Sequence, residues 1–182
     1  MATVNLTLRA PTSADIPDLV ALDQACFQGW WSAASYAQEL GRPSSLFLGL
    51  WTNHLLALGC LWLILEEAHV ILLAVHPEQR RQGLGKLLLG VLLHQATTRG
   101  ATRATLEVRA SNTAALTLYT QYGFQTAGRR RDYYQNPRED GLVLWRNGLD
   151  SPVYQQALVQ SIGQAQTHLA HLGYSLEWDQ AR

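Results

Sequence analysis

The sequence predicts an α/β domain, with a mixed central sheet of about seven strands, about four flanking helices and a further C-terminal helix. Apolar runs of high β-propensity alternate along the chain with segments whose apolar residues recur at helical spacing. The apolar run Ala68 to Val75 leads into a glycine turn that opens a helix. With 182 residues, 47% of them hydrophobic, the chain fits a single domain over residues 1–182, with a core over about 4–148 and an extension over about 150–182.

The first part of the sequence predicts strands and helices that are punctuated by turn residues. The expected strands are Val4 to Arg9, Leu46 to Thr52 and Leu55 to Leu65, the last two joined by a tight turn at Asn53-His54. Thr12 or Ser13 is expected to cap a first helix, and a second helix covers Ser32 to Leu40 and ends at Gly41. An aromatic segment, Phe27 to Trp31, connects these helices.

The second part continues the alternation of strands and helices. The expected order is the strand Ala68 to Val75, a helix to about Arg99, a strand Ala104 to Arg109, a helix Asn112 to Tyr122, a strand from Gly123-Phe124, a loop Gln135 to Gly141 and a strand Leu142 to Trp145. A last helix, Pro152 to Leu172, is capped by Asp150 or Ser151 and ended by Gly173. Its apolar face is expected to cover apolar surface of the core.

Composition excludes several classes of protein. Lys and Arg number 14 and Asp and Glu number 14, so no net charge draws the chain to nucleic acid or to an anionic membrane. The N-terminus lacks an export signal and Leu55 to Leu65 is too short to span a bilayer, so we expect a cytoplasmic protein. Cys26 and Cys60 lie in apolar sequence without metal-ligand spacing, which predicts reduced, buried thiols and no metal site.

The glycine turn predicts a seat for phosphate. Backbone N–H groups at a helix start have no partner within the helix, and the helix dipole favours an anion there. Gly83 and Gly85 allow a bulky anion to approach the main chain, while Arg80, Arg81 and Lys86 add positive charge. A phosphate-bearing cofactor is the expected ligand, and a plain strand-turn-helix joint with solvated arginines is the alternative.

The strand and helix that follow supply candidate acid-base groups. Leu106 and Val108 face one side of their strand, so Glu107 faces the other. Asn112 and Tyr119 are about two turns apart and share one face of the helix. A carboxylate and a phenol would then border one cleft, although such residues are also common as a solvated edge group and a packed ring.

Four segments together resemble one family. Arg80-Arg-Gln-Gly-Leu-Gly85, Leu106-Glu-Val-Arg-Ala-Ser-Asn112, Leu118-Tyr119 with Tyr122-Gly-Phe124, and Arg130-Arg-Asp-Tyr-Tyr134 are similar to motifs of the GNAT superfamily of N-acetyltransferases. Within it, the chain resembles ribosomal-protein-alanine N-acetyltransferases of the RimI type, over about Asp15 to Trp145. The resemblance implies the GNAT fold, with a sheet splayed open between two central strands.

The resemblance also implies acetyl-CoA as cosubstrate, without a metal. Its pyrophosphate would bind the turn Arg81 to Lys86, and its pantetheine would pair along the strand end. The implied cofactor-binding residues are Leu73, Ala74, Val75, Arg80, Arg81, Gln82, Gly83, Leu84, Gly85, Lys86 and Asn112. The family's general base falls on Glu107 and its general acid on Tyr119.

The implied reaction is acetyl transfer to the N-terminal α-amine of a protein, most specifically the alanine end of the eighteenth small-subunit ribosomal protein. An α-ammonium group with a pKa near 8 costs only about 1 kcal/mol to deprotonate at pH 7. Direct attack in a ternary complex is expected, because neither cysteine adjoins a histidine base. The alternatives are a small-molecule amine or antibiotic N-acetyltransferase and a noncatalytic acetyl-CoA-binding regulator.

Aromatic residues and the tail leave further alternatives open. Trp30 and Trp31, with Tyr133 and Tyr134, would either flank a channel for a peptide end or pack in the core and hairpin. Leu72 stands where the family often has a polar residue, which removes one amide contact to the acceptor. The C-terminal extension would either cover apolar surface or dock on a ribosomal partner.

Overall fold

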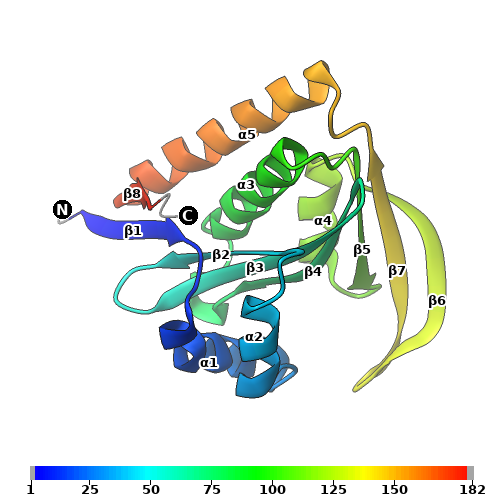
Figure 1. Ribbon diagram of the computed structural model, residues 1–182, viewed down its shortest axis with the longest axis horizontal. Coiled ribbons are helices and arrows are strands. Elements are labelled where there is room, and N and C mark those ends of the chain that lie inside the picture. The colour runs from blue at the N-terminus through cyan, green and yellow to red at the C-terminus, as the bar shows by residue number, and fades with distance from the viewer. Residues whose placement is uncertain (1–2, 180–182) are drawn as a thin grey trace.

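The computed structural model describes residues 3–179 and places eight strands of this range in one sheet, in the order β6-β7-β5-β4-β3-β2-β1-β8 (Figure 1). The strands are β1 (Val4–Arg9), β2 (Ser45–Trp51), β3 (Leu55–Ile64), β4 (Glu67–Val75), β5 (Arg103–Arg109), β6 (Gln125–Gln135), β7 (Arg138–Asn147) and β8 (Tyr174–Trp178). The helices are α1 (Ile16–Phe27), α2 (Ala33–Leu40), α3 (Leu84–Thr98), α4 (Thr113–Gln121) and α5 (Pro152–His171), with short 3-10 turns at Ser13–Asp15 and Pro77–Gln79. The predicted mixed α/β fold is therefore confirmed.

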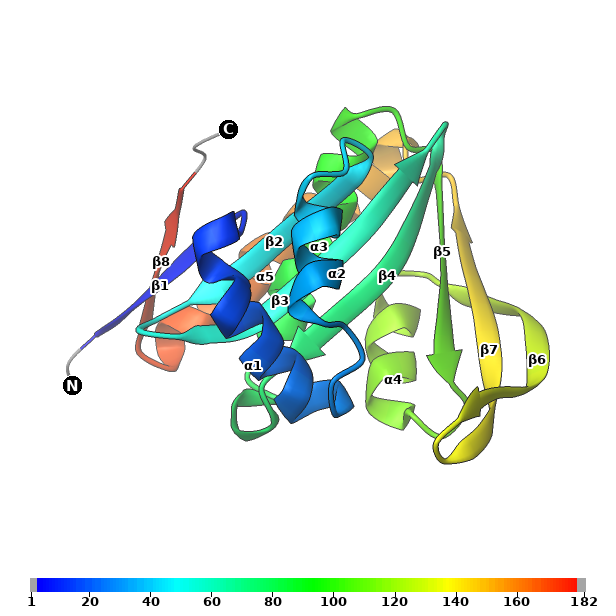
Figure 2. The same ribbon diagram turned by 60° about the horizontal axis from the view of Figure 1, so that its bottom comes forward.

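Helices cover both faces of the sheet. Helices α3 and α5 lie on one face, and α1 and α2 lie on the other (Figures 1 and 2). The first face is packed almost wholly by aliphatic side chains, such as Leu88 and Leu92 of α3 and Leu158 of α5. The second face has a smaller cluster around Leu19 of α1 and Tyr36 of α2. This layering buries the predicted core and confirms that the C-terminal helix covers apolar surface.

The sheet opens between β4 and β5. These parallel strands pair from Glu67 opposite Arg103 to Val70 opposite Leu106. Beyond Val70, β4 contains a register shift against β3 and continues to Val75 along β3, while β5 continues along β7. The two strands diverge toward their carboxyl ends (Figure 2). The structure thus confirms the splay that the resemblance implies.

The prediction of a loop from Gln135 to Gly141 is wrong. Strand β6 runs to Gln135 and β7 begins at Arg138, so a two-residue turn at Asn136 and Pro137 replaces most of the loop. The hairpin lies at the edge of the sheet, where polar side chains remain exposed while the backbone pairs. Turn-forming residues in this segment therefore did not prevent strand formation.

The C-terminal extension adds a strand that the sequence analysis did not predict. Helix α5 has Ser151 as its N-cap and ends before Gly173, whose φ is +89°. Strand β8 then pairs in parallel with β1, from Val4 opposite Tyr174 to Leu8 opposite Trp178. The ends of the predicted domain, residues 1–2 and 180–182, lie outside the described residues. Within residues 3–179, every helix is too short or too polar to cross a membrane.

Candidate active site

The glycine turn has the geometry of an anion-binding loop. Arg81 and Gly83 both adopt left-handed backbone conformations, with φ of +63° and +90°, and α3 begins at Leu84. Left-handed residues next to a helix start turn successive N–H groups toward one point, which favours an anion. The turn therefore has the backbone conformation that a phosphate site needs, and binding of phosphate there stays a prediction.

The turn is held between β4 and the C-terminal extension. A Cβ atom on Gly85 would lie 3.3 Å from Val75 of β4, so the helix start is pressed against the strand end. A Cβ atom on Gly83 would lie 3.2 Å from the ring of His168 of α5. The Tyr174 hydroxyl also donates a hydrogen bond to the Gln82 side chain at 3.1 Å. These contacts fix the position of the turn.

The end of β4 offers main-chain groups to the gap. The His76 N–H donates to the Leu56 carbonyl at 2.8 Å, and antiparallel pairing alternates, so Ala74 turns its main-chain groups toward β3. Leu73 and Val75 then turn theirs toward the gap. The Val75 carbonyl accepts hydrogen bonds from Arg80 Nε at 3.2 Å and from Cys26 Sγ at 3.3 Å.

Glu107 stands where β4 and β5 separate, and other side chains hold both of its oxygens. Its Oε2 lies 2.8 Å from His69 Nε2 of β4, and its Oε1 lies 3.2 Å from an Arg130 guanidinium nitrogen of β6. The Glu107 side chain is 17% exposed. The sequence analysis missed His69 and noted Arg130 only as part of a family motif, without a contact to Glu107. Strand alternation places His69 on the same face as Glu107. The carboxylate is thus oriented but still accessible.

Tyr119 lies near the end of α4. Its ring is buried and packs edge-on against Phe124, with ring centroids 5.8 Å apart. Burial raises the pKa of the Tyr119 phenol, and the nearby Tyr134 raises it further. Burial also raises the pKa of the Tyr134 phenol, and the charge of Glu107 raises it further. Tyr134 therefore lies close enough to Tyr119 and to Glu107 to interact electrostatically with each, and Tyr119 keeps its proton at neutral pH.

Asn112 caps the helix that carries Tyr119. Its side-chain oxygen accepts a hydrogen bond from the Ala115 N–H at 3.1 Å. The cap fixes the start of α4, and the amide nitrogen of the same side chain is left to meet a ligand. Asn112 therefore has a structural role in addition to its predicted contact with the cofactor.

The four aromatic candidates separate into core and surface residues. Trp31 packs edge-on against Tyr36, with centroids 5.2 Å apart, and belongs to the core of the α1–α2 face. Trp30 is 57% exposed and Tyr133 is 44% exposed. Tyr134 is partly buried under the guanidinium of Arg109, 4.2 Å from its ring centroid. Trp30 and the hairpin tyrosines thus remain available to a ligand, whereas Trp31 is a packing residue.

The cysteines, Leu72 and two further polar residues near the site take structural positions. Cys60 is a buried free thiol, as predicted. Cys26 is only partly buried and donates to β4. Leu72 is buried in the α1–α2 cluster, and His76 precedes the 3-10 turn after β4. Arg129 pairs with Asp140 at 3.0 Å.

Comparison with known proteins identifies the family. Residues 16–124 match the acetyltransferase (GNAT) family. The [ribosomal protein bS18]-alanine N-acetyltransferase of Escherichia coli (strain K12) is 34% identical over 140 residues, which are 76% of this chain and 95% of that relative. The crystal structure of the ribosomal-protein-S18-alanine N-acetyltransferase from Escherichia coli is similar, with a TM-score of 0.72 and 33% identity over 78% of this chain and 93% of that one.

A more distant structure shares the fold. The PaiA N-acetyltransferase from Thermoplasma acidophilum, solved in complex with coenzyme A, has a TM-score of 0.65 at 18% identity, over 78% of this chain and 98% of that one. The family match covers more than half of this chain, and the bacterial relative is matched over almost its whole length. The splayed sheet with its glycine turn is therefore that of an N-acetyltransferase, and the chain belongs to the acetyltransferase (GNAT) family.

Proposed function

We propose that this enzyme transfers the acetyl group of acetyl-CoA to the N-terminal α-amine of a protein, with the N-terminal alanine of ribosomal protein bS18 as the acceptor. One observation carries the proposal: the opening between β4 and β5 is bordered by both the anion-binding turn and Glu107. The relative that is named for this reaction, 34% identical, supports the choice of acceptor. The reaction belongs to the cytoplasm, where ribosomal proteins are made.

The residues present fit acetyl-CoA, which supplies a thioester as the acyl donor. Amides of the turn from Arg81 to Lys86 would bind the pyrophosphate, with Arg80 adding charge. Leu73 and the Val75 amide would pair with the pantetheine, because the alternation of β4 turns both toward the gap. Ala74 offers no free group to the pantetheine, because its main-chain groups face β3 and its side chain is buried in the α1–α2 cluster. Asn112 would contact the cofactor through its amide nitrogen.

Glu107 would receive the proton of the incoming amine, directly or through water. An α-ammonium has a pKa near 8, so it costs only about 1 kcal/mol to neutralise at pH 7, against about 5 kcal/mol for lysine. A carboxylate held in place is therefore sufficient. His69 and Arg130 hold Glu107 by its two oxygens. They are positioning residues that aim the carboxylate at the opening.

Tyr119 would stabilise the leaving sulfur. Coenzyme A leaves as a thiolate with basicity like that of cysteine, whose pKa is near 8.5. Because burial raises the pKa of Tyr119 above its ordinary value, donation of a hydrogen bond is favoured over release of the proton. Tyr119 therefore acts chiefly as a hydrogen-bond donor.

Exposed aromatic side chains would contact the acceptor. Trp30 follows α1, and Tyr133 and Tyr134 belong to the β6–β7 hairpin that also carries Arg130. Flat amphipathic rings bind a peptide end at low entropic cost. We propose that Trp30, Tyr133 and Tyr134 flank the entering N-terminus.

Mass spectrometry of a panel of peptides incubated with acetyl-CoA tests the proposed function. The panel contains the bS18 N-terminus, the same peptide with a blocked α-amine and an internal lysine, unrelated N-termini, and free small amines. Acetylation of the α-amine of the bS18 peptide is expected. Acetylation of free amines alone would support a small-molecule acetyltransferase, and binding of acetyl-CoA without any product would support a regulator; either result contradicts the proposal.

A further inference from the structure

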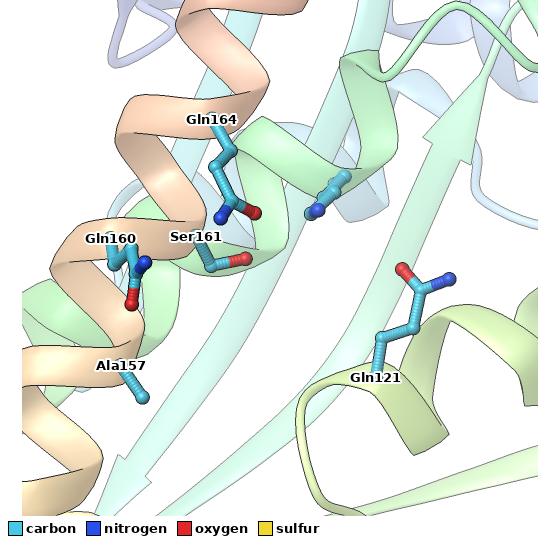
Figure 3. A pocket seen from close by; sticks show the side chains of 6 residues that line it. Gln121, Ala157, Gln160, Ser161 and Gln164 are labelled. Carbon is cyan, nitrogen blue, oxygen red and sulfur yellow. The ribbon is translucent and has the colours of Figure 1, made fainter.

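Helix α5 forms one wall of a polar cavity beside the cofactor turn. The family match ends at residue 124, before α5 begins at Pro152. A cavity of about 360 Å³ lies between α3, α4 and α5, and Figure 3 shows glutamine side chains of α5 and α4 extending into it. The cavity is lined by Lys86, Gln121, Ala157, Gln160, Ser161 and Gln164.

The cavity adjoins the expected pyrophosphate seat. Lys86 lies in the first turn of α3, directly after the glycine turn, and it also lines the cavity. His168, one helical turn beyond Gln164, lies 3.2 Å from the position of a Cβ atom on Gly83. Helix α5 therefore runs past the turn and continues along the cavity. A ligand held by the turn would have its next group within reach of α5.

The cavity lining has the chemistry of a nucleotide site. Lys86 offers an ammonium group, which suits a phosphomonoester. Gln121, Gln160 and Gln164 offer amides that both donate and accept hydrogen bonds, as adenine and ribose require. Among the described residues that line the cavity, none is acidic. Its volume falls within the range of small-ligand pockets.

The walls of this cavity are fixed by close packing. The Tyr122 hydroxyl donates to the Lys86 carbonyl at 2.6 Å, and Ser161 of α5 donates to the same hydroxyl at 3.4 Å. A Cβ atom on Gly90 would lie 2.9 Å from Ile162, so α3 and α5 are in close contact. The helices that form the walls are therefore already in place before a ligand binds, and only the exposed side chains of Gln160 and Gln164 must become ordered.

We propose that α5 completes a binding subsite for the 3′-phosphoadenosine end of coenzyme A. Lys86 faces the 3′-phosphate, and Gln160 and Gln164 hydrogen-bond the nucleoside. The inference rests on the proposed function, because binding of pyrophosphate at the glycine turn is what directs the nucleotide toward α5. The C-terminal helix thereby becomes part of cofactor recognition in addition to covering the core.

Calorimetric titration of the full chain with coenzyme A and with 3′-dephospho-coenzyme A tests the subsite. The double variant Gln160→Ala/Gln164→Ala is expected to bind coenzyme A about three- to tenfold more weakly, because it loses neutral hydrogen bonds. Lys86→Met is expected to reduce the preference for coenzyme A over the dephospho form. Gln156 is an exposed glutamine of α5 outside the cavity, so Gln156→Ala is the matched control. It is expected to bind coenzyme A and its dephospho form like the wild type.

The outcomes separate this inference from the proposed function. Unchanged binding of coenzyme A by the glutamine variant, or equal wild-type affinity for both forms, would overturn the subsite. If the wild type also acetylates the bS18 peptide, the proposed function stands without the subsite. Failure of the wild type to bind either form would contradict both. Thermal unfolding of each variant checks that the exposed substitutions leave the fold intact.

Discussion

The two sides of the gap between β4 and β5 are built differently. On the side where we propose that the cofactor binds, the turn after β4 presents main-chain amides whose direction depends on the left-handed backbone of Arg81 and Gly83. On the acceptor side, Glu107 is held by side chains from two other strands, and the exposed aromatic rings come from a loop and a hairpin. The first side depends on backbone conformation, and the second on which side chains the fold brings together.

This difference determines which substitutions each side tolerates. A main-chain site is damaged by an added Cβ atom but is insensitive to most exchanges of side chain. A side-chain site is damaged by loss of a single functional group while the backbone remains intact. Four substitutions, ordered here by expected effect, test that distinction, and a fifth tests a buried hydrogen bond of α5 away from both sides.

Glu107→Gln is expected to have the largest effect, a loss of about 10²–10⁴-fold in turnover, because a general base is removed. The pH profile should shift to higher pH, since the acceptor must then be neutral before it binds, with a pKa near 8. Peptide acetylation kinetics across pH measure both effects. Glu67→Gln, which removes a carboxylate paired with Arg103 on the closed part of β4, is the control. Wild-type turnover in Glu107→Gln would contradict the assignment.

Tyr119→Phe is expected to lower turnover about tenfold to a hundredfold, because a hydrogen bond to a charged leaving group contributes about 1.5–3 kcal/mol. The KM for acetyl-CoA should change little, since the bond forms mainly as the thiolate leaves. Steady-state kinetics with varied acetyl-CoA separate the two constants. Tyr154→Phe, another buried tyrosine, should keep wild-type turnover. A rise in KM without loss of turnover would instead assign Tyr119 to binding.

Gly83→Ala is expected to weaken acetyl-CoA binding about tenfold, because Ala strains the left-handed backbone by about 1–2 kcal/mol and its Cβ would lie 3.2 Å from His168. Gly100→Ala is a matched control, since Gly100 has φ of +95° with open space around it. Both variants should be less stable than the wild type. In calorimetric titration, only Gly83→Ala should bind acetyl-CoA more weakly. Equal affinity in the two variants would show that the turn does not bind the cofactor.

Trp30→Ala is expected to raise the KM for the acceptor peptide several-fold, which corresponds to a loss of about 1 kcal/mol of binding free energy. The KM for acetyl-CoA should not change. The ring is 57% exposed, so its loss should not unfold the chain. Leu65→Ala, at a 95% exposed position, is the control for removal of apolar surface. Kinetics with each substrate varied in turn give both constants. Identical peptide KM values in the wild type and Trp30→Ala would exclude this contact.

Tyr154→Phe is expected to have the smallest effect. It should lower the free energy of unfolding by about 1 kcal/mol at pH 7, because the variant lacks the hydrogen bond from Tyr154 to the Tyr122 carbonyl. Burial raises the pKa of Tyr154 to about 12, against about 10 in the unfolded chain. Its contribution to stability is thus complete below pH 10 and is lost as pH rises toward 12.

Denaturant unfolding between pH 8 and about pH 12 measures this effect. The free energy of unfolding of Tyr154→Phe should fall less steeply above pH 10 than that of the wild type, although Tyr36, Tyr119 and Tyr122 still contribute. Tyr133→Phe, at an exposed tyrosine, should follow the wild type. Parallel curves for Tyr154→Phe and the wild type would contradict the argument.

Local features were predictable because a few neighbouring residues determine them. The glycine turn, the cap of the last helix at Ser151 and its stop at Gly173 were all expected and all occur. The hairpin turn after Gln135 and strand β8 were not predicted. Both form at an edge of the sheet, where pairing with the backbone of a neighbouring strand stabilises them. Their side-chain patterns were too polar or too short to predict a strand.

The sequence by itself determined the order of most elements, the glycine turn before α3 and the face on which Glu107 lies, since hydrogen bonds and dihedral preferences within a few residues encode them. Only the tertiary structure decided that His69 and Arg130 hold Glu107, that Trp31 packs while Trp30 is exposed, and that α5 lies along the turn. Those contacts depend on strand register and helix packing between distant segments, and no local pattern specifies them.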